Sequence, residues 1–104
     1  MSCLFDFPTE VKTEGVDIVR GDDQAVAEVG AFLLALQDNP LPAGRQKLSP
    51  DDPTSFWIKL PCGVFVSWQI KATAVNMMRL AAGRVSPEIV VKVLGFGRDK
   101  PAKT

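Results

Sequence analysis

The stretch Phe56–Ile70, FWIKLPCGVFVSWQI, decides the fold because it is the longest run of strand-type sequence in the chain. Alternate side chains of an extended backbone point to opposite faces. One face is apolar and consists of Phe56, Ile58, Leu60, Val64, Val66, Trp68 and Ile70. The other face is mixed and consists of Trp57, Lys59, Phe65, Ser67 and Gln69. Because Pro61-Cys62-Gly63 is typical of a turn, the stretch predicts a β-hairpin that buries its first face and offers the second to a ligand or partner.

Length and composition indicate one globular domain spanning residues 1–104. Hydrophobic residues make up 46% and charged residues 23%, which suits a chain with one buried core and not a disordered one. No apolar run reaches the roughly 18–20 residues of a membrane span, so no membrane contact is expected. The beginning, MSCLFDFPTE, lacks a basic region followed by an apolar one, so a cytoplasmic location is expected.

Several residue types that carry chemistry are absent or rare. The chain has no histidine and no tyrosine, which excludes Ser-His-Asp and Cys-His catalysis and leaves Lys, Arg, Asp and Glu for proton transfer. Its two cysteines, Cys3 and Cys62, cannot complete a zinc site, so neither a metal nor another cofactor is expected. Both are interpreted as buried thiols, with a disulfide as the alternative, and Met77 and Met78 as packing residues.

Charge is divided along the chain although the net charge is zero. Residues 1–38 contain eight acids and two bases, a net charge of −6, and residues 39–104 contain ten bases and four acids, a net charge of +6. An acidic layer and a basic layer would result if the two parts stayed apart in space, and the basic layer would suit phosphates. If the two parts interleave in the fold, the charges cancel.

The strands predicted outside the hairpin lie near the two ends of the chain. Ser2–Phe7 is predicted as a short first strand, and Glu88–Phe96 as a last strand rich in Val and Ile. Leu41–Pro53 is interpreted as a proline-rich connection, and Gly97–Thr104 as a basic tail without regular structure.

Helices are predicted between these strands. Gln24–Gln37 has apolar residues at three- and four-residue spacing, and Ala72–Ala82 has good helix formers with Gly83 at a capping position. Glu10–Arg20 is interpreted as a short or broken helix because Gly15 interrupts it, with a strand as the alternative because Val16–Val19 alternates between apolar and polar residues. The order predicts an α+β domain, with a small, mostly antiparallel sheet of about four strands and helices packed on one face.

The motifs, in their order, resemble the RelE/ParE superfamily of type II toxin–antitoxin proteins from about Ser2 to Lys100. They are a short first strand, a helix ending in Asn-Pro, the basic connection GRQKL, the strands FWIKL and GVFVSWQI, and the last strand VVKVLGFGRDK. Ala72–Ser86 resembles an insertion where many members have a short turn. The resemblance implies a RelE-like fold, a bacterial origin and a partner antitoxin that holds the protein inactive.

RelE-like members cut mRNA on the ribosome, and ParE-like members inhibit DNA gyrase. The cleavage needs no metal, since cationic side chains assist attack of a 2′-hydroxyl on the adjacent phosphate. The resemblance implies catalytic roles for Lys59, Lys47 and Arg98. The candidate RNA-binding residues are Arg45, Trp57, Phe65 and Lys100, with the two rings stacking on unpaired bases or packing under an antitoxin or a second copy.

Departures from the family pattern concern the catalytic set. Trp57 stands where the RNA-cleaving members have a further lysine, and Phe65 stands where they have a phosphate-binding arginine. The base-stacking tyrosine near the C-terminus has no counterpart. The expected function is therefore a toxin that acts as an mRNA interferase or as a ribosome- or RNA-binding protein with an incomplete catalytic set. The alternatives are a non-catalytic module that binds gyrase or only its antitoxin, and an inactive, degenerate toxin.

Overall fold

The chain folds around one five-stranded sheet in the computed structural model, which describes residues 2–98. The strands are β1 (Leu4–Asp6), β2 (Gln46–Ser49), β3 (Asp52–Lys59), β4 (Phe65–Lys71) and β5 (Val90–Gly97). Their order across the sheet is β1-β5-β4-β3-β2. Only β1, at one edge, runs parallel to its neighbour β5, and the other described pairs are antiparallel.

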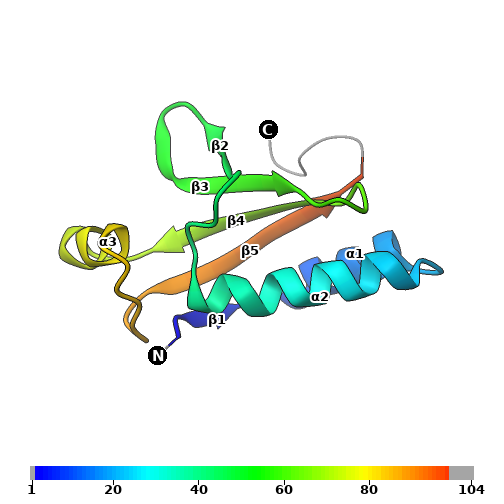
Figure 1. Ribbon diagram of the computed structural model, residues 1–104, viewed down its shortest axis with the longest axis horizontal. Helices are drawn as coiled ribbons and strands as arrows, with labels where there is room; N and C mark the ends of the chain where they lie inside the picture. The colour runs from blue at the N-terminus through cyan, green and yellow to red at the C-terminus, as the bar shows by residue number, and fades with distance from the viewer. Residues whose placement is uncertain (1, 99–104) are drawn as a thin grey trace.

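The helices are α1 (Thr9–Val19), α2 (Asp23–Asp38) and α3 (Ala74–Ala81). Figure 1 shows α1 and α2 side by side on one face of the sheet, and α3 at the end of the sheet where β4 leads into β5. Asp22 caps α2 by accepting a hydrogen bond from the Ala25 amide through its side chain. This arrangement is the predicted α+β class, with one strand more than expected.

The central hairpin is confirmed. Phe56 pairs with Trp68 and Lys59 pairs with Phe65, so the two faces alternate as the sequence predicts. The turn closes with a hydrogen bond from the Gly63 amide to the Leu60 carbonyl, and Gly63 has a φ of 92°, which a residue with a side chain rarely adopts.

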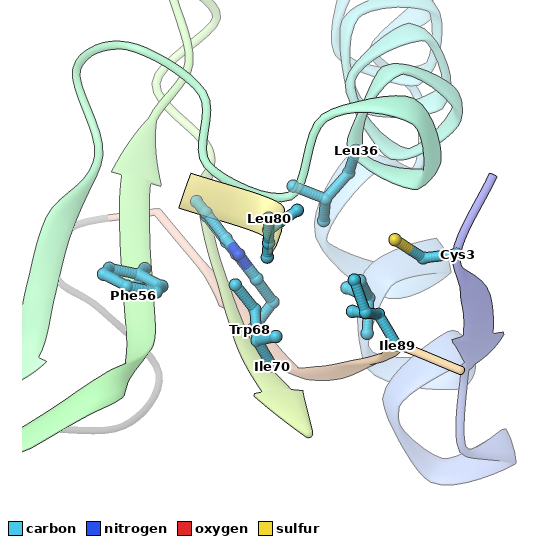
Figure 2. Close-up of a cluster of buried hydrophobic side chains, with 8 residues drawn as sticks. Cys3, Leu36, Phe56, Trp68, Ile70, Leu80 and Ile89 are labelled. Carbon is cyan, nitrogen blue, oxygen red and sulfur yellow. The ribbon is translucent and has the colours of Figure 1, made fainter. Parts of the chain in front are cut away.

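Trp68, in the middle strand β4, is the centre of the hydrophobic core (Figure 2). Its side chain is fully buried, with ring centroids of Phe32 and Phe56 at 5.6 and 5.9 Å. Its indole Nε1 donates a hydrogen bond of 3.0 Å to the carbonyl of Pro40, a buried residue just beyond α2. Leu36 and Ile70 complete the contact between α2 and β4. The sheet therefore packs on α2 through this one side chain and its neighbours.

Trp68→Phe should lower the free energy of unfolding by about 2–4 kcal/mol, because it removes the donor from the buried Pro40 carbonyl and leaves a cavity. Trp57→Phe is the matched control, since Trp57 lies on the other face and is only partly buried. It should cost about 1 kcal/mol or less. Urea unfolding followed by circular dichroism measures both, and equal losses would contradict the central role of Trp68.

Helix α1 runs without a break through Gly15, which packs directly on β5. A Cβ at Gly15 would lie 2.8 Å from Cε2 of Phe96, a buried ring that also contacts Phe7. The neighbouring Glu14 accepts a 2.8 Å hydrogen bond from the Phe96 amide through Oε1. Glycine here permits a close approach of helix to strand, which explains why a poor helix former stands in mid-helix.

Gly15→Ala should destabilise the protein by about 1–2 kcal/mol, because the clash with Phe96 outweighs the gain in helix propensity. Gly30→Ala in α2 is the control, since an added Cβ there meets no heavy atom within 4 Å. It should stabilise by about 0.5–1 kcal/mol. Thermal and urea unfolding of the two variants measure the difference, and a stabilised Gly15→Ala protein would show that α1 is not in close contact with β5.

Two predictions about local structure are wrong. The connection Leu41–Pro53 contains strand β2 and the start of β3, because Gln46–Ser49 pairs with β3 to form the far edge of the sheet. Met78 is 74% exposed and does not pack in the core, whereas Met77 does. The reason is that the buried side of α3 is occupied by Asn76 and Leu80.

Within residues 2–98, no helix is both long and apolar enough to cross a bilayer.

Candidate functional site

Strands β3 and β4 place three predicted site residues together on the sheet face opposite α1 and α2. Trp57 and Phe65 have ring centroids 5.4 Å apart, and Lys59 Nζ lies 5.8 Å from the Phe65 centroid. Paired residues on neighbouring strands point to the same face of a sheet. Ser67, which pairs with Trp57, and Gln69 and Lys92, which pair with each other, therefore also belong to this face. We call it the open face, and its outward side chains include Trp57, Lys59, Gln69, Lys71 and Lys92.

The three central residues differ in exposure. Lys59 is exposed and Trp57 is partly exposed, whereas Phe65 is only 8% exposed. Phe65 was expected to offer its ring to a ligand, but the ring lies against Trp57 and beneath the Lys59 ammonium. Ser67 is also buried on this side, with its hydroxyl donating to the Gly95 carbonyl. Trp57 and Lys59 are therefore the groups that a ligand would meet, and Phe65 supports them.

Lys71 and Lys92 extend the positive charge along the open face. Lys59 pairs with Phe65, and Lys71 is six residues beyond Phe65 on β4. At 3.3 Å per residue, Lys59 and Lys71 are therefore about 20 Å apart along the sheet. Lys92 lies between them on β5, and Asp6 of β1 is its cross-strand neighbour. The sequence analysis missed both lysines as site residues. In the sequence of β5, Lys92 lies between Val91 and Val93, and this alternation of apolar and polar residues could have predicted that Lys92 faces away from the core.

Lys47 and Arg45 do not share a face with Lys59. Lys47 pairs with Phe56, whose ring packs in the core on the helix side, so Lys47 projects from the helix side of the edge strand β2. The Arg45 guanidinium lies over the same Phe56 ring at 5.5 Å and donates to the carbonyls of Leu41 and Pro42. Lys59 is three positions beyond Phe56 on β3, so the alternation of side chains places it on the opposite face.

Arg98 is also on the helix side, two residues after the core residue Phe96. Its Nη2 donates to the Ile18 carbonyl at 3.0 Å and to Asp22 Oδ2 at 3.3 Å, and its Nη1 donates to the Cys62 carbonyl at 3.4 Å. The guanidinium therefore ties the end of β5 to the α1–α2 turn and to the hairpin turn. Lys100 lies outside the described residues. The predicted catalytic set Lys59, Lys47 and Arg98 is thus not brought together on one face.

A second surface feature is an apolar groove between α1 and α2, with a volume of about 290 Å³. Its walls are mainly aliphatic, and Gly15, Gly30 and Phe96 line it as well. The lining residues are Phe7, Lys12, Gly15, Val16, Val19, Val26, Val29, Gly30, Leu33 and Phe96. Val16 and Val26 are more than half exposed, which is unusual for aliphatic side chains beside one another. We call this feature the α1–α2 groove.

The two cysteines differ in burial. Both cysteines are free thiols, and burial raises the pKa of Cys3. Cys62 is only partly buried, so the prediction of two buried thiols holds for Cys3 alone. Among residues 2–98 no cluster of three or more potential ligands could hold a metal ion.

The sequence matches no protein-family model, and neither curated proteins nor solved structures gave a match.

Three carboxylates are held in the charged form by hydrogen bonds. The Ala25 amide lowers the pKa of Asp22, the Gln24 side chain lowers that of Glu28, and the Thr54 and Ser55 hydroxyls lower that of Asp52. The Glu28 carboxylate also accepts from the Cys62 amide at 2.8 Å, which joins α2 to the hairpin turn. Asp22 and Glu28 belong to the helical layer, and Asp52 is at the start of β3.

Stability should decline as the pH falls through about 4 and below, because these depressed pKa values mean that the unfolded chain binds protons more readily than the folded one. Asp52→Asn should be less stable at pH 7 and should show a shallower acid decline, whereas Asp51→Asn, at the exposed adjacent position, should follow the wild type. Urea midpoints between pH 3 and pH 7 measure this, and parallel curves for all three proteins would contradict it.

Proposed function

We propose that this protein is a RelE/ParE-like toxin of a type II toxin–antitoxin system that acts in the cytoplasm on single-stranded RNA of the translation machinery. It binds this RNA through the open face and is kept inactive by an antitoxin. The observation that carries the proposal is the exposed Lys59 beside the partly exposed Trp57, on a sheet face that neither α1 nor α2 covers. The architecture, helices on one face of a mostly antiparallel sheet, agrees with the resemblance.

Cation and ring together suit unpaired RNA. Trp57 provides a flat surface on which a base can stack, and Phe65 behind it fixes the ring. Lys59, Lys71 and Lys92 provide positive charge along about 20 Å of the face, which suits a phosphate backbone. Stacking and phosphate contacts read no particular base, so we expect weak sequence preference.

Binding, and not efficient cleavage, is the activity that these residues favour. Cleavage needs cationic groups that converge on one phosphate, and losing one such group commonly costs about 10²–10³ in rate. Lys47 projects from the helix side, and Arg98 is held by Asp22 and Ile18. Lys59 is thus left as the cation next to the rings.

Lys59→Ala should weaken binding of a labelled, unstructured single-stranded RNA and reduce the slope of log K against log salt by about 0.7, since one phosphate contact is lost. Trp57→Ala should weaken it by about 1–3 kcal/mol through lost stacking. Lys47→Ala is the matched control on the helix side and should bind like the wild type. Fluorescence anisotropy measures the affinities, and circular dichroism checks that each variant is folded.

Induction in bacterial cells separates the proposal from its rivals. The wild type should arrest growth without creating new mRNA ends, and Lys59→Ala should not arrest growth. New mRNA ends that depend on Lys59 would instead establish an endoribonuclease. Equal RNA affinities for Lys59→Ala and Lys47→Ala would overturn the assignment of the open face.

A non-catalytic protein-binding module is the second candidate. The scattered catalytic set favours it, because the open face would then serve only as a docking surface for gyrase or for the antitoxin. Co-purification decides between the two: ribosomes support the first candidate, and gyrase subunits in their place support the second.

A further inference from the structure

Helix α3 presents an apolar stripe to solvent. Val75 and Met78 are 58% and 74% exposed, and with Arg79 and Ala82 they follow the i, i+3, i+4, i+7 spacing that defines one helix face. The opposite side of the helix buries Leu80 in the core. Beside its core face, α3 therefore exposes two large apolar side chains, Val75 and Met78, with the cation of Arg79 next to them.

The charges around this stripe and around the α1–α2 groove have opposite sign. The segment from Ala72 to Arg84, which contains α3, has two bases, Arg79 and Arg84, and no acid, while Glu88 accepts a hydrogen bond from Asn76 of α3. Residues 9–38, which form the two helices of the groove, have seven acids and two bases, and one of these bases, Arg20, pairs with Asp17 at 2.8 Å. The two helices of the groove therefore have a net negative charge and the α3 segment a net positive one, although Lys12 lines the groove and Arg98 pairs with Asp22.

We propose that α3 of one molecule inserts Val75 and Met78 into the α1–α2 groove of a second copy. The two surfaces cannot meet within one chain, since α3 lies at the end of the sheet, away from α1 and α2 (Figure 1), and is held there by Leu80. The residues that line the groove on the helices belong to α1 and α2. The contact joins two different surfaces, so it is head-to-tail.

Dimensions agree with this occupant. The eight residues of α3 and the eight residues of α1 from Lys12 to Val19, which include its groove-lining residues, each span about 12 Å at 1.5 Å per residue. The groove receives aliphatic and thioether side chains, and Met adapts its shape to an irregular apolar surface. Arg79 and Arg84 then face the acidic helices, which steers the approach and makes the association sensitive to salt.

The first test is sedimentation velocity of the full chain over a range of concentrations. The wild type should self-associate, and 0.5 M salt should weaken it. Met78→Asp and Val26→Asp should each raise the apparent Kd about tenfold or more, since each places a carboxylate in an apolar contact. Leu34→Asp is the matched control, because Leu34 is an exposed residue of α2 that does not line the groove. It should associate like the wild type.

Mixing the two defective variants gives the decisive result. Met78→Asp retains an intact groove and Val26→Asp retains an intact α3, so an equimolar mixture should form a 1:1 heterodimer at a concentration at which each variant alone stays monomeric. A wild type that stays monomeric at its solubility limit would overturn the proposal. So would a mixture that stays monomeric, or a Leu34→Asp protein that is as defective as Val26→Asp.

Discussion

Burial of Trp68 in the middle strand is the constraint on which the rest of the structure depends. The ring is enclosed by Phe32, Phe56 and Leu36, and its Nε1 satisfies the carbonyl of Pro40. Because side chains alternate along a strand, fixing this residue inward fixes the direction of every other residue in β4. A register shift of one residue would turn the whole apolar set of the hairpin to solvent. The core therefore determines which face of the sheet is left open.

The same packing explains how α1 and α2 are positioned on the sheet. α2 ends at Asp38, and the chain turns at Asn39-Pro40 so that the Pro40 carbonyl meets the indole. At the other end of the sheet, Gly15 allows α1 to approach Phe96. Polar bonds from Arg98 to Ile18, and from the Cys62 amide to Glu28, hold the helix turn against the hairpin turn. Apolar contacts thus hold the helices on the sheet, and hydrogen bonds hold the α1–α2 turn against the hairpin turn.

Two surfaces of different chemistry result from this arrangement. The open face combines lysines with Trp57, which suits the proposed binding of RNA, and the α1–α2 groove is apolar within an acidic layer. Arg79, the base of α3, lies outside both. A chain of zero net charge can therefore have strong local fields, and these fields carry both the functional proposal and the proposed self-association.

The sequence by itself determined the α+β class, the hairpin and the direction of Trp57 and Lys59, because period-two alternation and the turn at Gly63 are local signals. It also determined α2, since Asp22 and Asn39-Pro40 mark its ends. Only the tertiary structure decided that Lys47 and Arg98 lie on the helix side, because that depends on the pairing of β2 with β3 and on the parity of residues after Phe96. The burial of Phe65 and the groove between α1 and α2 were also decided only by the tertiary structure. Each of these two features depends on contacts between residues that are distant in the chain.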